Sequence, residues 1–361
     1  MTTAEARMAH EIGEAPQAVA CQADGLAQPI AELVARLRRR PPRVVVTCAR
    51  GSSAHAATYA KHLIERSIGA PVAEAAPNIA SVYGRRLDLE DQLFLAISQS
   101  GKSDDLIEMA LSARSAGALT AAMVNATDSP LTRACDIVLP IGAGPERSVA
   151  ASKTFVATLT AVQRLVAAWT GDSALARAID ALPQRLSSAT ALDWGEAAAA
   201  LSRTLSLVTI GRGPTLAVAR EASLKLKETC NLHAEAFSGA EFLHGPVALV
   251  SSRYPILMFM PTDQAAAGMQ QLAADLRRKG TALFTTEPGS VPSRGTSSFS
   301  SGRGGGDPGL SGRLPALAYE HPETDAVCLV QSFYAMLIRL AERLGLDVDR
   351  PRHLQKVTRT R

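Results

Sequence analysis

Three ionisable residues, Glu221, Lys225 and Glu228, are spaced i, i+4 and i+7 in a stretch with helical character, so they share one helix face. A carboxylate beside a lysine can move a proton, because the ammonium group stabilises developing negative charge. On an arbitrary helix the same spacing most often gives a solvated row of salt bridges. Residues 231–246 favour a site, because two of the chain's seven histidines and two further acids follow directly.

A metal site is the alternative for this stretch. Glu241 and His244 have the i, i+3 spacing of a carboxylate–histidine ligand pair. The sequence holds no second such pair and no HExxH motif, so we expect no metal.

A second set of candidates follows the apolar run Leu93–Ile97, where a turn rich in hydroxyls precedes a helical stretch. Hydroxyls and free amides at a helix N-terminus suit a phosphate dianion. A similar turn, Gly51-Ser52-Ser53, ends the neighbouring predicted strand and could close the same pocket. The alternative is that these residues only cap helices, but two such turns in one unit favour phosphate. The turn residues are Ser98, Gln99, Ser100, Gly101, Lys102 and Ser103.

A nucleotide is not expected at this turn. Gly101-Lys102-Ser103 matches the end of a P-loop, but the glycine required five residues earlier is Ala96. We therefore expect neither a nucleotide nor any other cofactor.

An internal repeat sets the elements that position these residues. Two Arg-Gly pairs, each between a β-branched run and a helical stretch, are 162 positions apart, at Arg50 and Arg212. The same offset places the run Leu93–Ile97 on Pro255–Phe259. Strands alternating with helices predict an α/β fold of two tandem doubly wound parallel sheets, each flanked by helices in three layers. Such sheets bind ligands at the carboxyl ends of their strands.

The repeat also predicts the domain boundaries. We expect an N-terminal arm (1–40, helical near 29–40), a first, phosphate-binding domain (41–170), and connecting helices (171–203). A second domain with the catalytic base (204–345) and a C-terminal tail (346–361) follow. The stretch 288–313, almost entirely Gly, Ser, Pro and Arg, predicts a low-complexity loop.

Composition narrows the class of protein. The chain has 361 residues, 47% hydrophobic and 20% charged, which is typical of globular domains. A net charge of +4 and 4% aromatics argue against a nucleic-acid partner. The N-terminus does not resemble a signal peptide, and no uninterrupted apolar run approaches 18 residues, so we expect no membrane span. Five scattered cysteines fit a reducing, cytoplasmic setting.

Five motifs carry a resemblance to a known family. The chain resembles the SIS (sugar isomerase) family, and within it the isomerase half of glutamine–fructose-6-phosphate transaminases (glucosamine-6-phosphate synthases) and the SIS-type glucosamine-6-phosphate deaminases. The motifs keep the family's order over nearly the whole chain. They are SQSGKS (98–103), ERSVAASKTF (146–155), LKLKETCNLHAEAF (224–237), GAEFLHGPVAL (239–249) and DVDRPRHLQKVT (347–358).

The resemblance implies roles for matching residues. Glu228 would move a proton between C1 and C2, and Lys225 would contact sugar oxygens and developing charge. His244 would open the sugar ring, reaching in from the partner subunit of a homodimer. Lys356 would form a Schiff base with the open-chain ketose, and Val149 would line the sugar. The sugar 6-phosphate would be held by Ser52, Ser53, Ser98, Gln99, Ser100 and Ser103.

Two departures refine the expected reaction. Ala151 stands where the synthase has a serine, so sugar contacts differ. About 40 residues precede the first strand, so we expect no glutaminase part and no glutamine-dependent synthesis. The expected activity is conversion of glucosamine 6-phosphate and water to fructose 6-phosphate and ammonia. The alternatives are an aldose–ketose isomerase, a deglycase of another amino-linked hexose 6-phosphate, ammonia-dependent synthesis, or a non-catalytic sugar-phosphate sensor.

Overall fold

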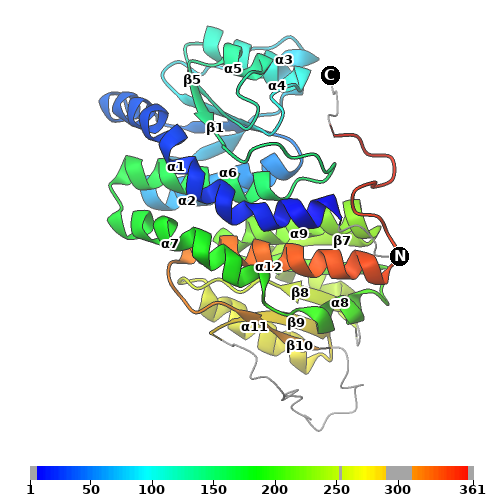
Figure 1. Ribbon diagram of the computed structural model, residues 1–361. Coiled ribbons are helices and arrows are strands. Elements are labelled where there is room, and N and C mark those ends of the chain that lie inside the picture. The colour runs from blue at the N-terminus through cyan, green and yellow to red at the C-terminus, as the bar shows by residue number, and fades with distance from the viewer. Residues whose placement is uncertain (1–5, 252–253, 290–310, 357–361) are drawn as a thin grey trace. The chain divides into compact units, whose positions relative to one another are not determined.

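Two five-stranded parallel sheets organise the chain (Figure 1). The computed structural model describes residues 6–251, 254–289 and 311–356. These fall into two units. Unit A comprises the described residues within 14–183 and 353–361, and unit B comprises those within 1–13 and 184–352. All strand pairs in both sheets are parallel, which confirms the predicted fold class.

The sheet of unit A has the strand order β2-β1-β3-β4-β5. Its order reverses between β1 and β3, the point where doubly wound sheets bind ligands. Its strands are β1 (Val45–Cys48), β2 (Val72–Glu74), β3 (Leu93–Ser98), β4 (Leu119–Val124) and β5 (Ile137–Pro140). The helices that follow them are α2 (Ser52–Ile68), α3 (Asn78–Ser81), α4 (Asp104–Ser115), α5 (Pro130–Ala134) and α6 (Lys153–Thr170).

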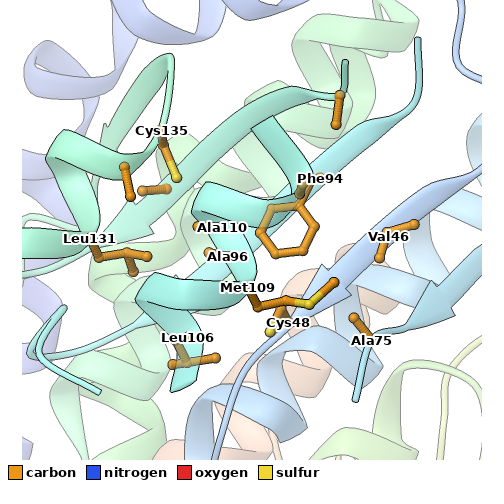
Figure 2. Close-up of a cluster of buried hydrophobic side chains, with 14 of the residues drawn as sticks. Val46, Cys48, Ala75, Phe94, Ala96, Leu106, Met109, Ala110, Leu131 and Cys135 are labelled. Carbon is orange, nitrogen blue, oxygen red and sulfur yellow. The ribbon is translucent and has the colours of Figure 1, made fainter. Parts of the chain in front are cut away.

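Successive side chains along the strands of unit A point to opposite faces of the sheet, so an apolar layer forms on each face. Val46 and Cys48 of β1 and Phe94 of β3 pack against Met109 of α4 and Leu131 of α5 (Figure 2). The residues between them point to the opposite face because successive strand side chains alternate. Helices α2 and α6 pack against each other. Burial of both strand faces accounts for the nearly continuous apolar runs in the sequence.

Unit B repeats this arrangement. Its order β10-β9-β8-β6-β7, read from β7, reproduces the order of unit A. The strands are β6 (Ser206–Gly211), β7 (His233–Ser238), β8 (Pro255–Met258), β9 (Ala282–Pro288) and β10 (Gly312–Ala316). The helices are α8 (Gly195–Leu201), α9 (Pro214–Cys230), α10 (Gly239–Leu243), a short 3-10 helix η1 (Pro246–Leu249), α11 (Ala266–Arg278) and α12 (Pro322–Arg343).

One face of the second sheet packs against α10 and α11 through Phe242, Met269 and Leu272. The long helix α12 packs against α8 and α9. By length and composition α12 could cross a membrane, but 83% of its apolar window is buried inside the structure, as in the core helix of a soluble fold.

Two glycines show how closely the halves repeat. Gly51 precedes α2 with φ 55° and ψ −134°, and Gly213 precedes α9 with φ 58° and ψ −128°. Residues with a Cβ rarely adopt this conformation. The Arg-Gly repeat in the sequence therefore marks the same strand-to-helix turn in each unit.

Two expectations about the elements are corrected. The N-terminal segment is one helix, α1 (Arg7–Arg39), with Pro16 and Pro29 inside it, so the expected helix near 29–40 is too short. Most of the predicted low-complexity loop 288–313 lies outside the described residues, while Pro288 and Gly312 belong to strands. Helix α7 (Ser173–Thr190) joins the two units along the chain.

Candidate active site

The two serine turns of unit A follow adjacent strands. β1 pairs directly with β3, so both turns leave the sheet at its switch point, as the sequence predicts. Ser52 and Ser53 are the first residues of α2, where backbone N–H groups lack partners within the helix. The turn after β3 leads into α4 in the same way.

The turn 98–103 is folded by its own hydroxyls. Ser98 Oγ accepts a hydrogen bond from the Gly101 amide at 3.0 Å, and Ser100 Oγ accepts one from the Lys102 amide at 3.3 Å. Gly101 has φ 62°, and a Cβ there would lie 2.1 Å from Ser129 Oγ. Ser103 stands at the N-cap of α4 without a side-chain capping bond, which disfavours the reading of this turn as a helix cap. Ser98 is buried, and Gln99, Ser100 and Ser103 are half-buried.

An ion pair joins the two turns. Arg50 precedes Gly51, and its guanidinium donates from Nε (3.1 Å) and Nη2 (2.8 Å) to Asp105 Oδ2, in the first turn of α4. In the sequence Arg50 stands out only as part of the internal repeat, and Asp105 does not stand out. No sequence signal pairs two residues 55 positions apart.

The C-terminal tail lies against the segment before α6. Lys356 Nζ is 2.6 Å from the Ser148 carbonyl oxygen and 3.3 Å from Glu146 Oε2. The neighbouring Val149 is half-buried. The structure therefore brings together Lys356 and the segment of Val149, both selected from the sequence more than 200 residues apart. Glu146, quoted in a motif but given no role, completes this contact.

The charged row on α9 consists of Glu221, Lys225 and Glu228, and most of it lies in the protein interior. The side chains of Glu221 and Lys225 are each 1% exposed, whereas that of Glu228 is 21% exposed. Lys225 Nζ lies 3.5 Å from Glu221 Oε1 and forms an ion pair with Glu228. Tyr334 of α12 donates to Glu221 Oε1 at 2.9 Å. Because Glu221 and Lys225 are buried, these residues are not a solvated row of salt bridges. Burying a charge costs several kcal/mol before pairing, and the ion pairs offset that cost.

This row has a simple chemical consequence. Glu221, which accepts a hydrogen bond from Tyr334, pairs with the Lys225 ammonium from within the core. Within the row, Glu228 is the residue that reaches solvent. A carboxylate in this position can take a proton from a bound molecule while a fixed cation stabilises the charge that forms. Tyr334 was missed because it lies on a helix more than a hundred residues downstream.

His244 lies on the surface of unit B. It follows α10, is exposed, and its backbone amide donates to the Glu241 carbonyl oxygen at 3.0 Å. Leu243 and Leu249 on either side are 56% and 50% exposed. Among the described residues, no group of three or more His, Cys, Asp or Glu side chains is placed to hold a metal ion.

In unit B, the turn after β8 is equivalent to the turn 98–103, and its side chains contact other residues of the same unit. Thr262, after β8, donates to Asp325 Oδ2 at 2.8 Å, and Arg185 donates to Asp325 Oδ1 at 2.7 Å. These residues line a cavity with Thr286 and Ser332. Burial raises the pKa of the Asp325 carboxyl. An acid at this position, paired with the local arginine, disfavours a phosphate.

The fold is that of an α/β protein with two doubly wound sheets. Among the described residues, the serine turns follow β1 and β3 of the first sheet. Comparison with known proteins places the chain further. A family model described as SIS domain matches residues 40–168 and 200–295. The chain belongs to the SIS domain family.

Individual relatives agree with this assignment. An isomerizing glutamine–fructose-6-phosphate aminotransferase from Pyrobaculum aerophilum is 32% identical over 363 residues, covering 97% of this chain and 56% of that protein. The chain spans about half the length of the curated relatives it matches. A crystal structure from Silicibacter pomeroyi, described as a candidate phosphosugar isomerase, has a TM-score of 0.86 and 42% identity, covering 95% of this chain and all of that one.

A further structural neighbour is the glucosamine-6-phosphate deaminase from Thermotoga maritima. Its TM-score is 0.69 at 18% identity, with 98% of this chain and all of that chain covered. At this identity the likeness shows a shared fold alone.

Proposed function

We propose that the protein is a phosphosugar isomerase that deaminates glucosamine 6-phosphate, giving fructose 6-phosphate and ammonia. The observation that carries this proposal is the buried row on α9, in which Lys225 is fixed between two carboxylates and only Glu228 reaches solvent. A row of this kind suits the transfer of a proton between adjacent carbons of a sugar. The serine turns of unit A supply groups for the 6-phosphate.

The reaction begins with the open-chain aldehyde, formed with the help of His244. Glu228 takes the proton from C2, and the electron pair forms a C1–C2 double bond while the C1 oxygen gains negative charge. Lys225 stabilises that charge. Reprotonation at C1 leaves an imine at C2. Water then adds to C2, the C2–N bond breaks, and ammonia leaves, so that C1 is reduced and C2 oxidised with no net redox change.

The tail lysine favours a substrate with nitrogen at C2. An isomerase that only moves hydrogen between C1 and C2 needs no amine of its own. An amine near C2 is useful when the intermediate is an imine, because Lys356 can displace ammonia by exchange before water releases the ketose. The contacts of Lys356 with the segment of Val149 support this reading.

Release of ammonia tests the proposal. Purified protein given glucosamine 6-phosphate should form ammonia and fructose 6-phosphate in equal amounts, and Lys227→Gln, an exposed change beside the row, should behave as the wild type. A panel of other 6-phosphosugars, first screened for thermal stabilisation, runs in parallel. Turnover of another sugar without ammonia from this one would reassign the substrate. Stabilisation by phosphosugars without any turnover would indicate a sensor.

A second copy of the chain completes the proposed site. Exposed Leu243 and Leu249 flank His244, and exposed apolar side chains around a functional group are typical of an interface. We expect a symmetric homodimer in which each His244 serves the partner's sugar.

A further inference from the structure

Glu146 is a buried carboxylate with both oxygens engaged. Its side chain is 0% exposed. Oε1 accepts hydrogen bonds from the backbone amides of Ser152 and Thr154, each at 3.0 Å, where α6 begins. Negative charge is stabilised at a helix N-terminus, so the first turn of α6 fixes this carboxylate in place.

The second oxygen faces the tail lysine. Glu146 Oε2 is 3.3 Å from Lys356 Nζ, and the other described contact of Nζ is the Ser148 carbonyl oxygen. A carbonyl oxygen can accept a hydrogen bond but does not take up a proton at ordinary pH. Glu146 is therefore the partner of Lys356 that can accept the proton an ammonium must lose before it attacks a carbonyl carbon.

We propose that Glu146 is the acid–base partner of Lys356 in Schiff-base formation with the sugar. This inference rests on the proposed function, because it concerns the Schiff base that the proposed reaction forms at Lys356. At 3.3 Å the carboxylate lies within hydrogen-bond reach of the ammonium proton that a general base must take.

The step balances without any co-reactant. Glu146 takes one proton from the Lys356 ammonium, and the freed electron pair forms a bond to C2 of the open-chain ketose. A second proton then moves from the nitrogen to the former carbonyl oxygen, which gives a carbinolamine with a hydroxyl at C2. Glu146 returns its proton to that hydroxyl, which leaves as water, and the nitrogen pair forms the C=N bond. The carboxylate is regenerated.

Reductive trapping tests this role. Fructose 6-phosphate and sodium cyanoborohydride are added at pH 7.0 and pH 9.5, and intact-protein mass and peptide mapping follow the adduct at Lys356. The variants are Glu146→Gln, whose amide oxygen can still accept from Ser152 and Thr154, and Glu146→Asp, which keeps a carboxylate. Glu65→Gln, which changes an exposed lysine–glutamate pair of unit A, is the matched control. Lys356→Arg marks the background.

We expect E146Q to be trapped about 100-fold more slowly than the wild type at pH 7.0, within the usual range for general acid–base catalysis. At pH 9.5 the deficit should shrink to less than about tenfold, because hydroxide in solution can then act as the base in place of the carboxylate. E146D should recover part of the rate at pH 7.0, and E65Q should not differ from the wild type. If E146Q does not fold, the pH dependence of E146D is read instead.

Other results overturn the inference. Wild-type trapping rates in E146Q would do so, and so would an equal deficit at both pH values, which indicates a misplaced lysine. Absence of wild-type trapping at Lys356 would also overturn it. Ammonia release from glucosamine 6-phosphate is measured on the same preparations. Trapping that depends on Glu146 without ammonia release would refute the proposed function and leave this inference standing.

Discussion

Arg50 donates two hydrogen bonds to a single carboxylate oxygen of Asp105, and this contact joins the two serine turns of unit A. The Asp105 side chain is 1% exposed and that of Arg50 is 52% exposed. The buried acid thus fixes a half-exposed arginine between turns that follow β1 and β3. The pair holds the two turns together and places positive charge beside them.

Arg50→Met should therefore weaken phosphosugar binding. The substitution removes the link between the two turns and the cation beside them. We expect KM to rise about tenfold or more, equivalent to about 1.4 kcal/mol, with a smaller change in kcat. Steady-state kinetics and ligand-induced thermal shifts measure the effect.

The control for this change is Arg133→Met. Arg133 pairs with Asp128 on the surface of the same unit, with side chains 76% and 100% exposed, where an ion pair contributes little. The control should leave KM unchanged. Equal KM values for R50M and the wild type would show that the pair does not shape a phosphate site.

Tyr334→Phe should lower both the stability of the protein and its kcat, because Tyr334 supports the α9 row. The change removes the hydrogen bond to Glu221 and leaves a buried carboxylate with one partner fewer. We expect a loss of about 1–3 kcal/mol in the free energy of unfolding and a fall in kcat. Tyr59→Phe is the matched control, because the buried Tyr59 hydroxyl accepts from Gln163 at 2.7 Å in unit A. It should lower stability without lowering kcat beyond the loss of folded protein.

Glu228→Gln should abolish turnover while sparing phosphosugar binding. The amide keeps the shape and the contact with Lys225 but cannot accept a proton, so we expect kcat to fall by about 10²–10⁴-fold. Fructose 6-phosphate should still stabilise the variant against heat. Its half-saturating concentration should stay within about twofold of the wild-type value. Retention of full activity would remove Glu228 from the proton transfer.

Much of this arrangement could be read from the sequence because it depends on local patterns. The offset of 162 between Arg50 and Arg212 predicted two equivalent strand-to-helix turns, and Gly51 and Gly213 share one backbone conformation. The i, i+4, i+7 spacing placed Glu221, Lys225 and Glu228 on one face. The two parallel sheets followed from apolar runs that alternate with helical stretches.

Other features of the site could not be predicted because they depend on contacts between residues far apart in the sequence. Whether the α9 row is buried is decided by α12 and Tyr334, and whether Glu146 matters is decided by where Lys356 lies. The long helix α1 was missed because Pro16 and Pro29 argue for a break. Its apolar residues, including Ile12 and Leu33, are nevertheless buried along its length, so packing overrides the proline signal.

Four of the five cysteines should be unreactive in the folded protein. Burial raises the pKa of the Cys48, Cys135 and Cys328 thiols to about 12 and that of Cys230 to about 11. Cys48 and Cys135 lie in the core shown in Figure 2. Cys21 is exposed. At pH 8 a thiol reagent should modify one thiol in the native protein, none in Cys21→Ser, and all five in denaturant.

The raised pKa values of these thiols predict that the folded protein becomes less stable at alkaline pH. An unfolded thiol ionises near its ordinary pKa of about 8.5, whereas the folded thiols stay protonated to higher pH. The stability due to this difference is complete below pH 8.5 and is lost as pH rises towards 11–12. The urea midpoint should fall between pH 8.5 and pH 10.5. A constant midpoint would show that these thiols do not ionise differently on unfolding.

A mixed dimer tests whether His244 acts in the partner's site. Glu228→Gln and His244→Ala chains, each inactive alone, are co-expressed with different tags and purified through both. If His244 crosses the interface, one site of the mixed dimer carries both changes and the other carries neither. The purified heterodimer should then regain about half of the wild-type activity. If His244 serves its own chain, each site keeps one defect and the heterodimer is as inactive as its parents, so recovery of activity can come only from a histidine supplied across the interface.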